Sequence, residues 1–303
     1  MLDHQWQLLS GDGTVDFLFG TADTGVQTSR APDLGQRDVR TRDVPLPRED
    51  GTDFGVDYEN GTLLTFETNV LTSGWAENSD LLNEFRKAWS ARVLRQKHGS
   101  NAILKVQNAG RIRRCYGRPR RFAEADGDLT HEGYTSAVCD FATYDGKFYA
   151  EEISSMQAQI RTPDSVGLVW PTDGLATVGD TFFATELLDP SQISTTAIVE
   201  TETWVWVEIH GPTTNPVVKL GDLVLALDTT IPDGMSVTLD PRPWSRGVTR
   251  SDGANLAKFL TWETPPMSEW LIEPGAHDLV YRGTDPTNTS LVVANWREAF
   301  HRP

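Results

Sequence analysis

The sequence has little of what several classes of protein require. It holds two cysteines, Cys115 and Cys139, among 303 residues, which is too few for a disulfide framework, and they lack the spacing of a zinc site. None of the six histidines lies two or four positions from another, so paired zinc ligands are not expected. No stretch approaches the roughly 20 apolar residues of a membrane span. We therefore expect buried thiols, no metal, no cofactor and no membrane partner.

The start of the chain, MLDHQWQLL, lacks both the basic region and the continuous apolar run of a secretory signal. We therefore expect the protein to be made and assembled in the cytoplasm.

Catalytic motifs are missing as well. The sequence has no GxSxG elbow, no phosphate-binding loop, no GxGxxG and no HExxH. The best candidate for catalysis is the pair Glu200 and Glu202, which a strand would place on one side at a separation that glycosidases use. Trp204 and Trp206 would share that side and could stack on sugar rings. We expect no enzyme, and we keep two alternatives: a carbohydrate-binding module that uses the two tryptophans, and a β-sandwich glycosidase.

Charge is abundant but unevenly distributed. The net charge is −16, yet twelve of the 27 basic residues and none of the 43 acidic residues fall between positions 86 and 121. The rest of the chain then carries a net charge of −28. A basic block on an acidic chain can dock on an acidic surface of another copy or of another acidic partner. Nucleic acid is the weaker interpretation, because the acidic remainder would repel it.

Turn residues and short apolar runs predict a mainly β protein. Gly 25 and Pro 17 are spread along the chain, and alternating segments between them favour short strands. One helix is expected over residues 79–97, capped by Asn78 or Ser79, with apolar side chains at helical spacing and cations near its end. Residues 21–52 resemble a long loop or arm. We place one domain at 1–165 and a second at 166–303.

The second half of the chain predicts strands alone, as in an antiparallel sandwich. In the strand expected within 193–211, alternation places Trp204 and Trp206 among glutamates, so we expect both rings to be partly exposed. Strand periodicity also predicts that KFLTW, residues 258–262, forms a strand. Four further tryptophans are expected in the core: Trp244, Trp262, Trp270 and Trp296.

Four segments together resemble a known family. They are RCYGRPRRF (114–122), EGYTSAVCDFATYDGKFYAE (132–151), VEIHGPTTNPVVKLGD (207–222) and LIEPGAHDLVYRG (271–283). In this order the segments resemble the distal tail proteins of long-tailed (siphovirus) bacteriophages, known in phages of actinobacteria as minor tail proteins. The GRPRR segment resembles a turn in that family, and His277 stands where asparagine is common. Residues 21–52 have no counterpart that we can place.

The resemblance implies an architecture and a set of partners. It implies an N-terminal β-sandwich or barrel-like ring domain with one helix, and a C-terminal galectin-like antiparallel β-sandwich. It implies a non-enzymatic, hexameric ring at the virion tail tip that contacts the tail tube protein, the tape-measure and tail-associated proteins and a receptor-binding protein, with host cell-wall glycan as a further candidate.

A closed ring needs two unlike surfaces on each subunit, and arginine is suited to pairing with carboxylates. We therefore expect the basic block to contact a neighbouring copy through seven arginines: Arg86, Arg92, Arg113, Arg114, Arg118, Arg120 and Arg121.

Overall fold

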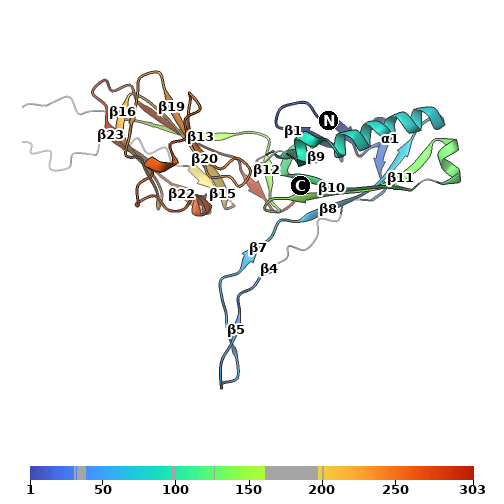
Figure 1. Cartoon of the computed structure of the whole chain (residues 1–303), viewed down its shortest axis with the longest axis horizontal. Coiled ribbons are helices and arrows are strands. Elements are labelled where there is room, and N and C mark those ends of the chain that lie inside the picture. The colour runs from blue at the N-terminus through green and yellow to red at the C-terminus, as the bar shows by residue number, and fades with distance from the viewer. Residues whose placement is uncertain (31, 33–38, 97–99, 126, 161–196, 200) are drawn as a thin grey trace, which may run out of the picture. The chain divides into compact units, whose positions relative to one another are not determined.

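The computed structural model describes residues 1–30, 32, 39–96, 100–125, 127–160, 197–199 and 201–303. The chain forms two compact units, drawn in Figure 1. Unit 1 comprises Met1–Glu151 together with Ala299–Pro303, and unit 2 comprises Glu152–Glu298. The predicted boundary at residues 165 and 166 lies outside the described residues. The last five residues return to unit 1, because β25 (Ala299–Phe300) pairs with β12 (Phe148–Ala150).

Unit 1 is built on one nine-stranded antiparallel sheet in the order β2-β1-β9-β10-β11-β8-β3, with β12 and β25 attached beside β10. The strands on the main path are β1 (Trp6–Ser10), β2 (Asp16–Phe19), β3 (Val26–Thr28), β8 (Leu63–Leu71), β9 (Ala102–Asn108), β10 (Arg111–Ala125) and β11 (Tyr134–Thr143). Unit 1 also contains two short 3₁₀ turns, η1 (Ala22–Thr24) and η2 (Asp128–Glu132).

The two ends of this sheet almost meet, so the sheet is nearly a closed barrel. Gly20, just after β2, donates its N–H to the Val26 carbonyl, and its own carbonyl accepts the N–H of Thr28. A side chain at Gly20 would lie 2.6 Å from the His4 carbonyl oxygen, and its φ of +119° is unfavourable for other residues. Glycine is therefore required where β2 approaches β3.

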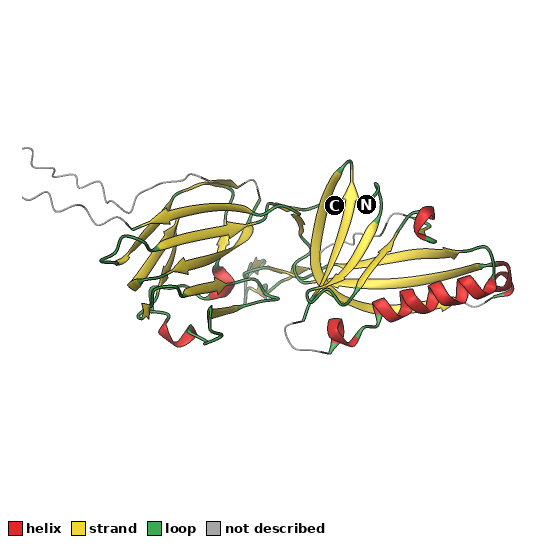
Figure 2. Ribbon diagram, turned by 90° about the horizontal axis from the view of Figure 1, so that it is seen from above, coloured by secondary structure: helices red, strands yellow, loops and turns green. Residues whose placement is uncertain are grey.

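Helix α1 (Trp75–Trp89) covers one face of the sheet, and Figure 2 shows it lying along the strands. Its Phe85 and Trp89 are fully buried. Phe85 stacks on Phe17 with ring centroids 4.9 Å apart, and Trp89 meets the edge of Phe66 at 6.2 Å. This aromatic core fixes which side of α1 faces the sheet and which side faces solvent.

The predicted helix bounds need correction. The helix over 79–97 begins four residues earlier and ends at Trp89, and a short second helix, α2 (Arg92–Arg95), follows. Asn78 is no cap: it is buried inside α1, donates to the carbonyls of Val70 and Gly133, and accepts from Thr135. Ala91 has an extended backbone, with ψ of 127°, which breaks the helix that periodicity alone would continue.

Residues 39–59 form a thin two-stranded ribbon, which we call the arm (Figure 1). Its paired segments are β4 (Val39–Arg40) with β7 (Tyr58–Glu59), and β5 (Val44–Pro45) with β6 (Thr52–Asp53). Every residue from 39 to 59 is exposed. The arm therefore gains nothing from the core of unit 1, although its second half leads into β8.

Unit 2 is a sandwich of a six-stranded and a four-stranded antiparallel sheet, with a further strand pair. The first sheet contains β13 (Ser154–Gln159), β15 (Thr203–His210), β19 (Ser236–Asp240), β20 (Gly247–Arg250), β21 (Leu271–Ile272) and β24 (Leu291–Trp296). The second contains β16 (Thr213–Leu220), β17 (Leu223–Ala226), β18 (Thr230–Ile231) and β23 (Leu279–Thr284). The further pair is β14 (Ala197–Val199) with β22 (Gly275–His277), and two 3₁₀ turns are η3 (Ala257–Phe259) and η4 (Met267–Glu269).

The core of unit 2 lies between its two main sheets and includes the fully buried Trp270 and Tyr281. The mainly β, two-unit fold predicted from the sequence is confirmed. Two predictions for this unit are wrong. Residues 258–262 form the turn η3 and its continuation instead of a strand, and Trp262 is 91% exposed instead of buried.

None of the described helices is long and apolar enough to cross a membrane.

We predict that Trp89→Ala lowers the free energy of unfolding of unit 1 by about 3–5 kcal/mol, because it empties a fully buried site. The change also removes the hydrogen bond from the indole N–H to the Asp140 carbonyl. Denaturant unfolding followed by circular dichroism measures the loss. Trp75→Ala on the same helix is the matched control: this ring is 56% exposed, and its removal should cost less than about 1 kcal/mol. Equal losses for the two variants would contradict the assigned core.

Candidate assembly surface

The basic block of the sequence folds into the end of α1, helix α2, β9 and β10 of unit 1. We call the exposed cations of the end of α1, of α2 and of the second half of β10 the basic surface. Its members are Arg86, Lys87, Arg92, Arg95, Arg120 and Arg121. Because the apolar side of α1 is buried on the sheet, the cations of α1 face solvent.

A β-bulge in β10 exposes two of these arginines. Pro119 pairs with Phe141 and Phe122 pairs with Cys139, so Arg120 and Arg121 together lie opposite the single residue Asp140. Strand alternation would turn one of two consecutive side chains inward, but the extra residue of a bulge removes that requirement. Both arginines are exposed. The sequence interpretation of GRPRR as a turn is wrong, because these residues lie within β10, whose length is 15 residues.

Direct contacts hold the three elements together. Arg95 of α2 donates to the Arg120 carbonyl at 2.9 Å, and Arg86 of α1 forms an ion pair with Glu124 of β10 at 2.9 Å. Arg86 also lies over the Phe122 ring, 5.8 Å from its centroid. The same elements carry half-buried apolar side chains that pack on the core of unit 1, namely Ala88, Ala91, Val93 and Phe122, which we call the apolar floor. The basic surface thus combines exposed cations and this apolar floor on three elements that contact one another.

Two of the arginines predicted to contact a neighbour have partners within unit 1. Arg114 is 9% exposed, donates through Nε to Glu151 at 2.9 Å and makes a second contact to the same carboxylate. Lys105 reaches Glu151 at 2.9 Å. Arg113 lies 3.9 Å from the centroid of the Phe300 ring and donates to the Arg302 carbonyl. Strand β12 and the returning β25 bring these partners to β10.

The electrostatics of these groups follow from their surroundings. Burial raises the pKa of Glu151, but hydrogen bonds from Arg114 and Lys105 and their positive charges outweigh it, so that the pKa lies below its usual value of 4.5. Desolvation, with repulsion from Arg111, lowers the pKa of the Arg113 guanidinium. Burial raises the pKa of the Cys115 thiol, which keeps this residue protonated and unreactive.

Of the seven predicted arginines, four are exposed: Arg86, Arg92, Arg120 and Arg121. Arg118 lies beside them, half-buried, and donates to the Ser100 carbonyl at 3.0 Å. Lys87 and Arg95, which are not among the seven, are exposed on α1 and α2 as well. Whether this surface contacts another copy stays a prediction.

The expected exposure of Trp204 and Trp206 is wrong: each is 8% exposed. The Arg242 guanidinium lies 4.1 Å from the centroid of the Trp206 ring and is held there by two hydrogen bonds to Asp240, at 2.8 and 2.6 Å. Arg242, in the loop after β19, thus covers the ring face that strand alternation leaves open. Glu200 lies outside the described residues, so the glutamate pair cannot be placed.

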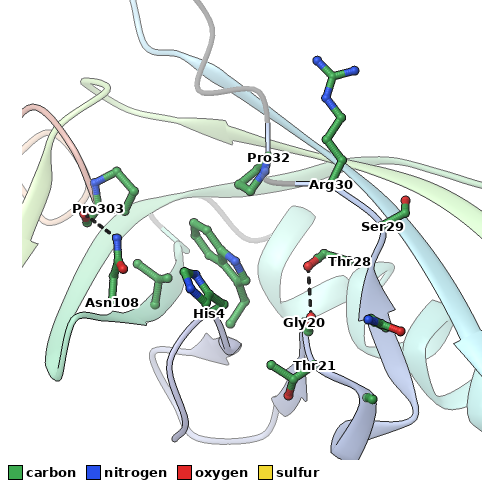
Figure 3. Close-up of a pocket in the computed structure, with 13 residues that line it drawn as sticks. His4, Gly20, Thr21, Thr28, Ser29, Arg30, Pro32, Asn108 and Pro303 are labelled. Atoms are coloured by element: carbon green, nitrogen blue, oxygen red, sulfur yellow. Dashed lines mark hydrogen bonds between the residues drawn. The ribbon is translucent and has the colours of Figure 1, made fainter.

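A cavity of about 500 Å³ lies in unit 1, near the point where the sheet almost closes (Figure 3). Trp6, Thr28, Val106 and Asn108 line it, and Asn108 donates to the Pro303 carbonyl at one side. Among its described lining residues, His4 and Arg30 are the titratable ones. No group of His, Cys, Asp and Glu within the described ranges could hold a metal ion.

No protein-family model matches the sequence, and no curated protein matches it. Solved structures do match. The fold is similar to the crystal structure of the SPP1 Dit protein, described as a paradigm of the hub adsorption apparatus in phages that infect Gram-positive bacteria. The TM-score is 0.55 at 14% identity, over 97% of this chain and 99% of that chain. This chain has the Dit fold.

Two further solved structures have a similar fold. A chain of the phage P2 baseplate, in its activated conformation with calcium, matches with a TM-score of 0.55 at 13% identity, over 99% of both chains. The same baseplate with strontium matches with a TM-score of 0.52 at 14% identity, over 96% of this chain and 97% of that one. The predicted likeness to distal tail proteins is confirmed for the fold, and it extends through both units.

The sequence analysis missed the apolar side chains of the arm. Phe54 is 83% exposed, Val56 66% and Tyr58 47%. Their alternating positions in DFGVDYE are the period-two signal of a strand. The acidic and glycine residues between them make that signal resemble a loop.

We predict that Glu151→Gln lowers the free energy of unfolding by about 1 kcal/mol at pH 7, since it weakens a charged, partly solvated cluster. The folded-state pKa of Glu151 is lowered, so its contribution is present above the usual glutamate pKa and is lost as the pH falls through the folded value. The difference between wild type and variant should therefore vanish in acid. Denaturant titrations from pH 7 to pH 3 measure it; a difference that does not depend on pH would contradict the assignment.

Proposed function

We propose that this protein is a structural subunit of the tail tip of a long-tailed phage, where six copies close into a ring that joins the tail tube to the tail-tip proteins. The observation that carries the proposal is the fold shared with the SPP1 Dit protein along nearly the whole length of both chains. That protein is described as a hub, and the P2 matches come from a baseplate.

The charge distribution supports ring closure. In a ring, one surface of a subunit meets a different surface of the next. The basic surface is one such patch on a chain whose other residues carry a large negative charge, so a neighbour approaching with its acidic side is attracted to it. Exposed ion pairs contribute at most about 1 kcal/mol each. Apolar contact must therefore add to them, and the half-buried floor of the basic surface offers it.

The proposed partners follow from the same role. Unit 1 forms the ring and contacts the tail tube protein and the tape-measure or tail-associated proteins, while unit 2 carries contacts to a receptor-binding protein. The protein would then act at the virion tail tip, after assembly in the host cytoplasm. The galectin-like character of unit 2 belongs to this proposal, which its two-sheet sandwich supports.

A role in glycan recognition has less support. It depends on open faces of Trp204 and Trp206, and both rings are buried. The glycosidase alternative is not tested by the described residues, because Glu200 lies outside them. The neighbouring folds belong to a phage hub and a phage baseplate, which favours a structural role over catalysis.

We predict that the purified chain forms particles of six times its mass of 33.6 kDa, and that the double variant Arg120→Glu, Arg121→Glu raises the concentration needed for assembly at least tenfold. The reversed charges would repel the acidic neighbour, whereas both exposed positions on β10 tolerate glutamate without loss of folding. Native mass spectrometry and six-fold class averages in electron microscopy measure the effect.

The matched control is Lys219→Glu with Lys258→Glu, which makes the same change in charge at exposed positions of unit 2 and should leave assembly unchanged. A wild-type chain that stays monomeric at every concentration, alone and with tail proteins, would refute the proposed function.

A further inference from the structure

The two segments of the arm pair with each other, although all of their residues are exposed. Its register is defined at both ends, and Leu46 donates to the Gly51 carbonyl across the tip. Gly55 donates to the Asp43 carboxylate at 3.2 Å. A side chain at Gly55 would lie 2.4 Å from the Arg42 carbonyl oxygen, so the two segments of the ribbon are held close together.

The arm exposes more apolar surface than an isolated ribbon tolerates. Six large apolar side chains are exposed within residues 39–59: Val39, Val44, Leu46, Phe54, Val56 and Tyr58. A two-stranded ribbon is at best marginally stable in water, and clustered exposed apolar groups mark a contact site. Its unpaired edges also present free backbone donors and acceptors.

The charge of the arm is opposite to that of the basic surface. Residues 39–59 contain three arginines and six acidic residues, a net charge of −3. Arg40 and Arg42 lie over the Tyr58 ring, 5.9 and 5.6 Å from its centroid, near the base of the ribbon. Asp53 and Asp57 flank the exposed Phe54 and Val56 in the sequence. An acidic and apolar ribbon thus matches a basic surface with an apolar floor.

Every arm residue and all six cations of the basic surface are exposed. About ten residues per side give the ribbon a reach of roughly 30 Å, enough to cross to a neighbouring subunit. We propose that the arm of one copy lies on the basic surface of the next copy, with Phe54 and Val56 on the floor that includes Val93 and Phe122. This inference rests on the proposed ring, and it names the two unlike surfaces that close it.

The test places the photo-crosslinking amino acid p-benzoylphenylalanine at Phe54 in the full chain. Equal amounts of isotopically heavy and light protein are mixed before irradiation, so that mass spectrometry separates crosslinks between copies from crosslinks within one. We expect crosslinks between copies to peptides that contain residues 86–96 or 118–124. The same amino acid at Trp262, which is 91% exposed on unit 2, is the control for unspecific capture and should not give them.

A charge exchange supplies the second part of the test. The variant R120E/R121E should lose at least nine-tenths of the Phe54 crosslink, and adding D53K/D57K in the arm should restore it. A merely damaged basic surface would not be rescued by the added lysines. Crosslinks between copies that avoid residues 86–96 and 118–124, or no rescue by the exchange, would overturn the inference.

The experiments distinguish a failure of this inference from a failure of the proposed function. Six-fold rings without the Phe54 crosslink would leave the ring standing and overturn the docking of the arm. Absence of both rings and crosslinks between copies would overturn both.

Discussion

The packing of α1 on the nearly closed sheet of unit 1 is the contact on which the other features depend. Phe85 and Trp89 are fully buried among rings from the strands, and clusters of this kind contribute several kcal/mol per residue. The same contact decides where the charges go. Since the apolar side of the helix is used for the core, its cations are left on the outside, and the ion pair of Arg86 with Glu124 joins the helix to β10.

The long strand β10 divides the arginine-rich segment into two parts with different roles. Beside its first half, β12 and β25 bring Glu151 to Arg114, and Phe300 and Arg302 to Arg113. These contacts stabilise unit 1. In its second half, the bulge opposite Asp140 leaves Arg120 and Arg121 exposed. Bulges commonly redirect side chains in this way. Exposed arginines and a structural ion cluster therefore lie on one strand, separated by Gly117.

The arm and unit 2 differ in whether their apolar side chains are shielded from water. Unit 2 buries its own between two sheets, and even Trp206 is covered by an arginine from a neighbouring loop. The arm buries none in the described chain. Apolar surface that folding leaves in water is free to contribute to association, so the arm is the element most directly suited to assembly.

The sequence by itself determined the mainly β class, the presence of a helix with one apolar side, the concentration of basic residues and the likeness to distal tail proteins. These follow from periodicity, composition and the order of motifs, which are local or additive properties of the chain. Tertiary structure decided the helix bounds, because Asn78 is satisfied by Val70, Gly133 and Thr135 far away in sequence. It also decided which arginines are exposed, because Glu151 and Phe300 reach the basic segment only through strand pairing. Exposure of Trp206 and Trp262 was likewise decided by loops that alternation cannot place. Burial depends on contacts between distant segments, and a local pattern carries no information about which segments will meet.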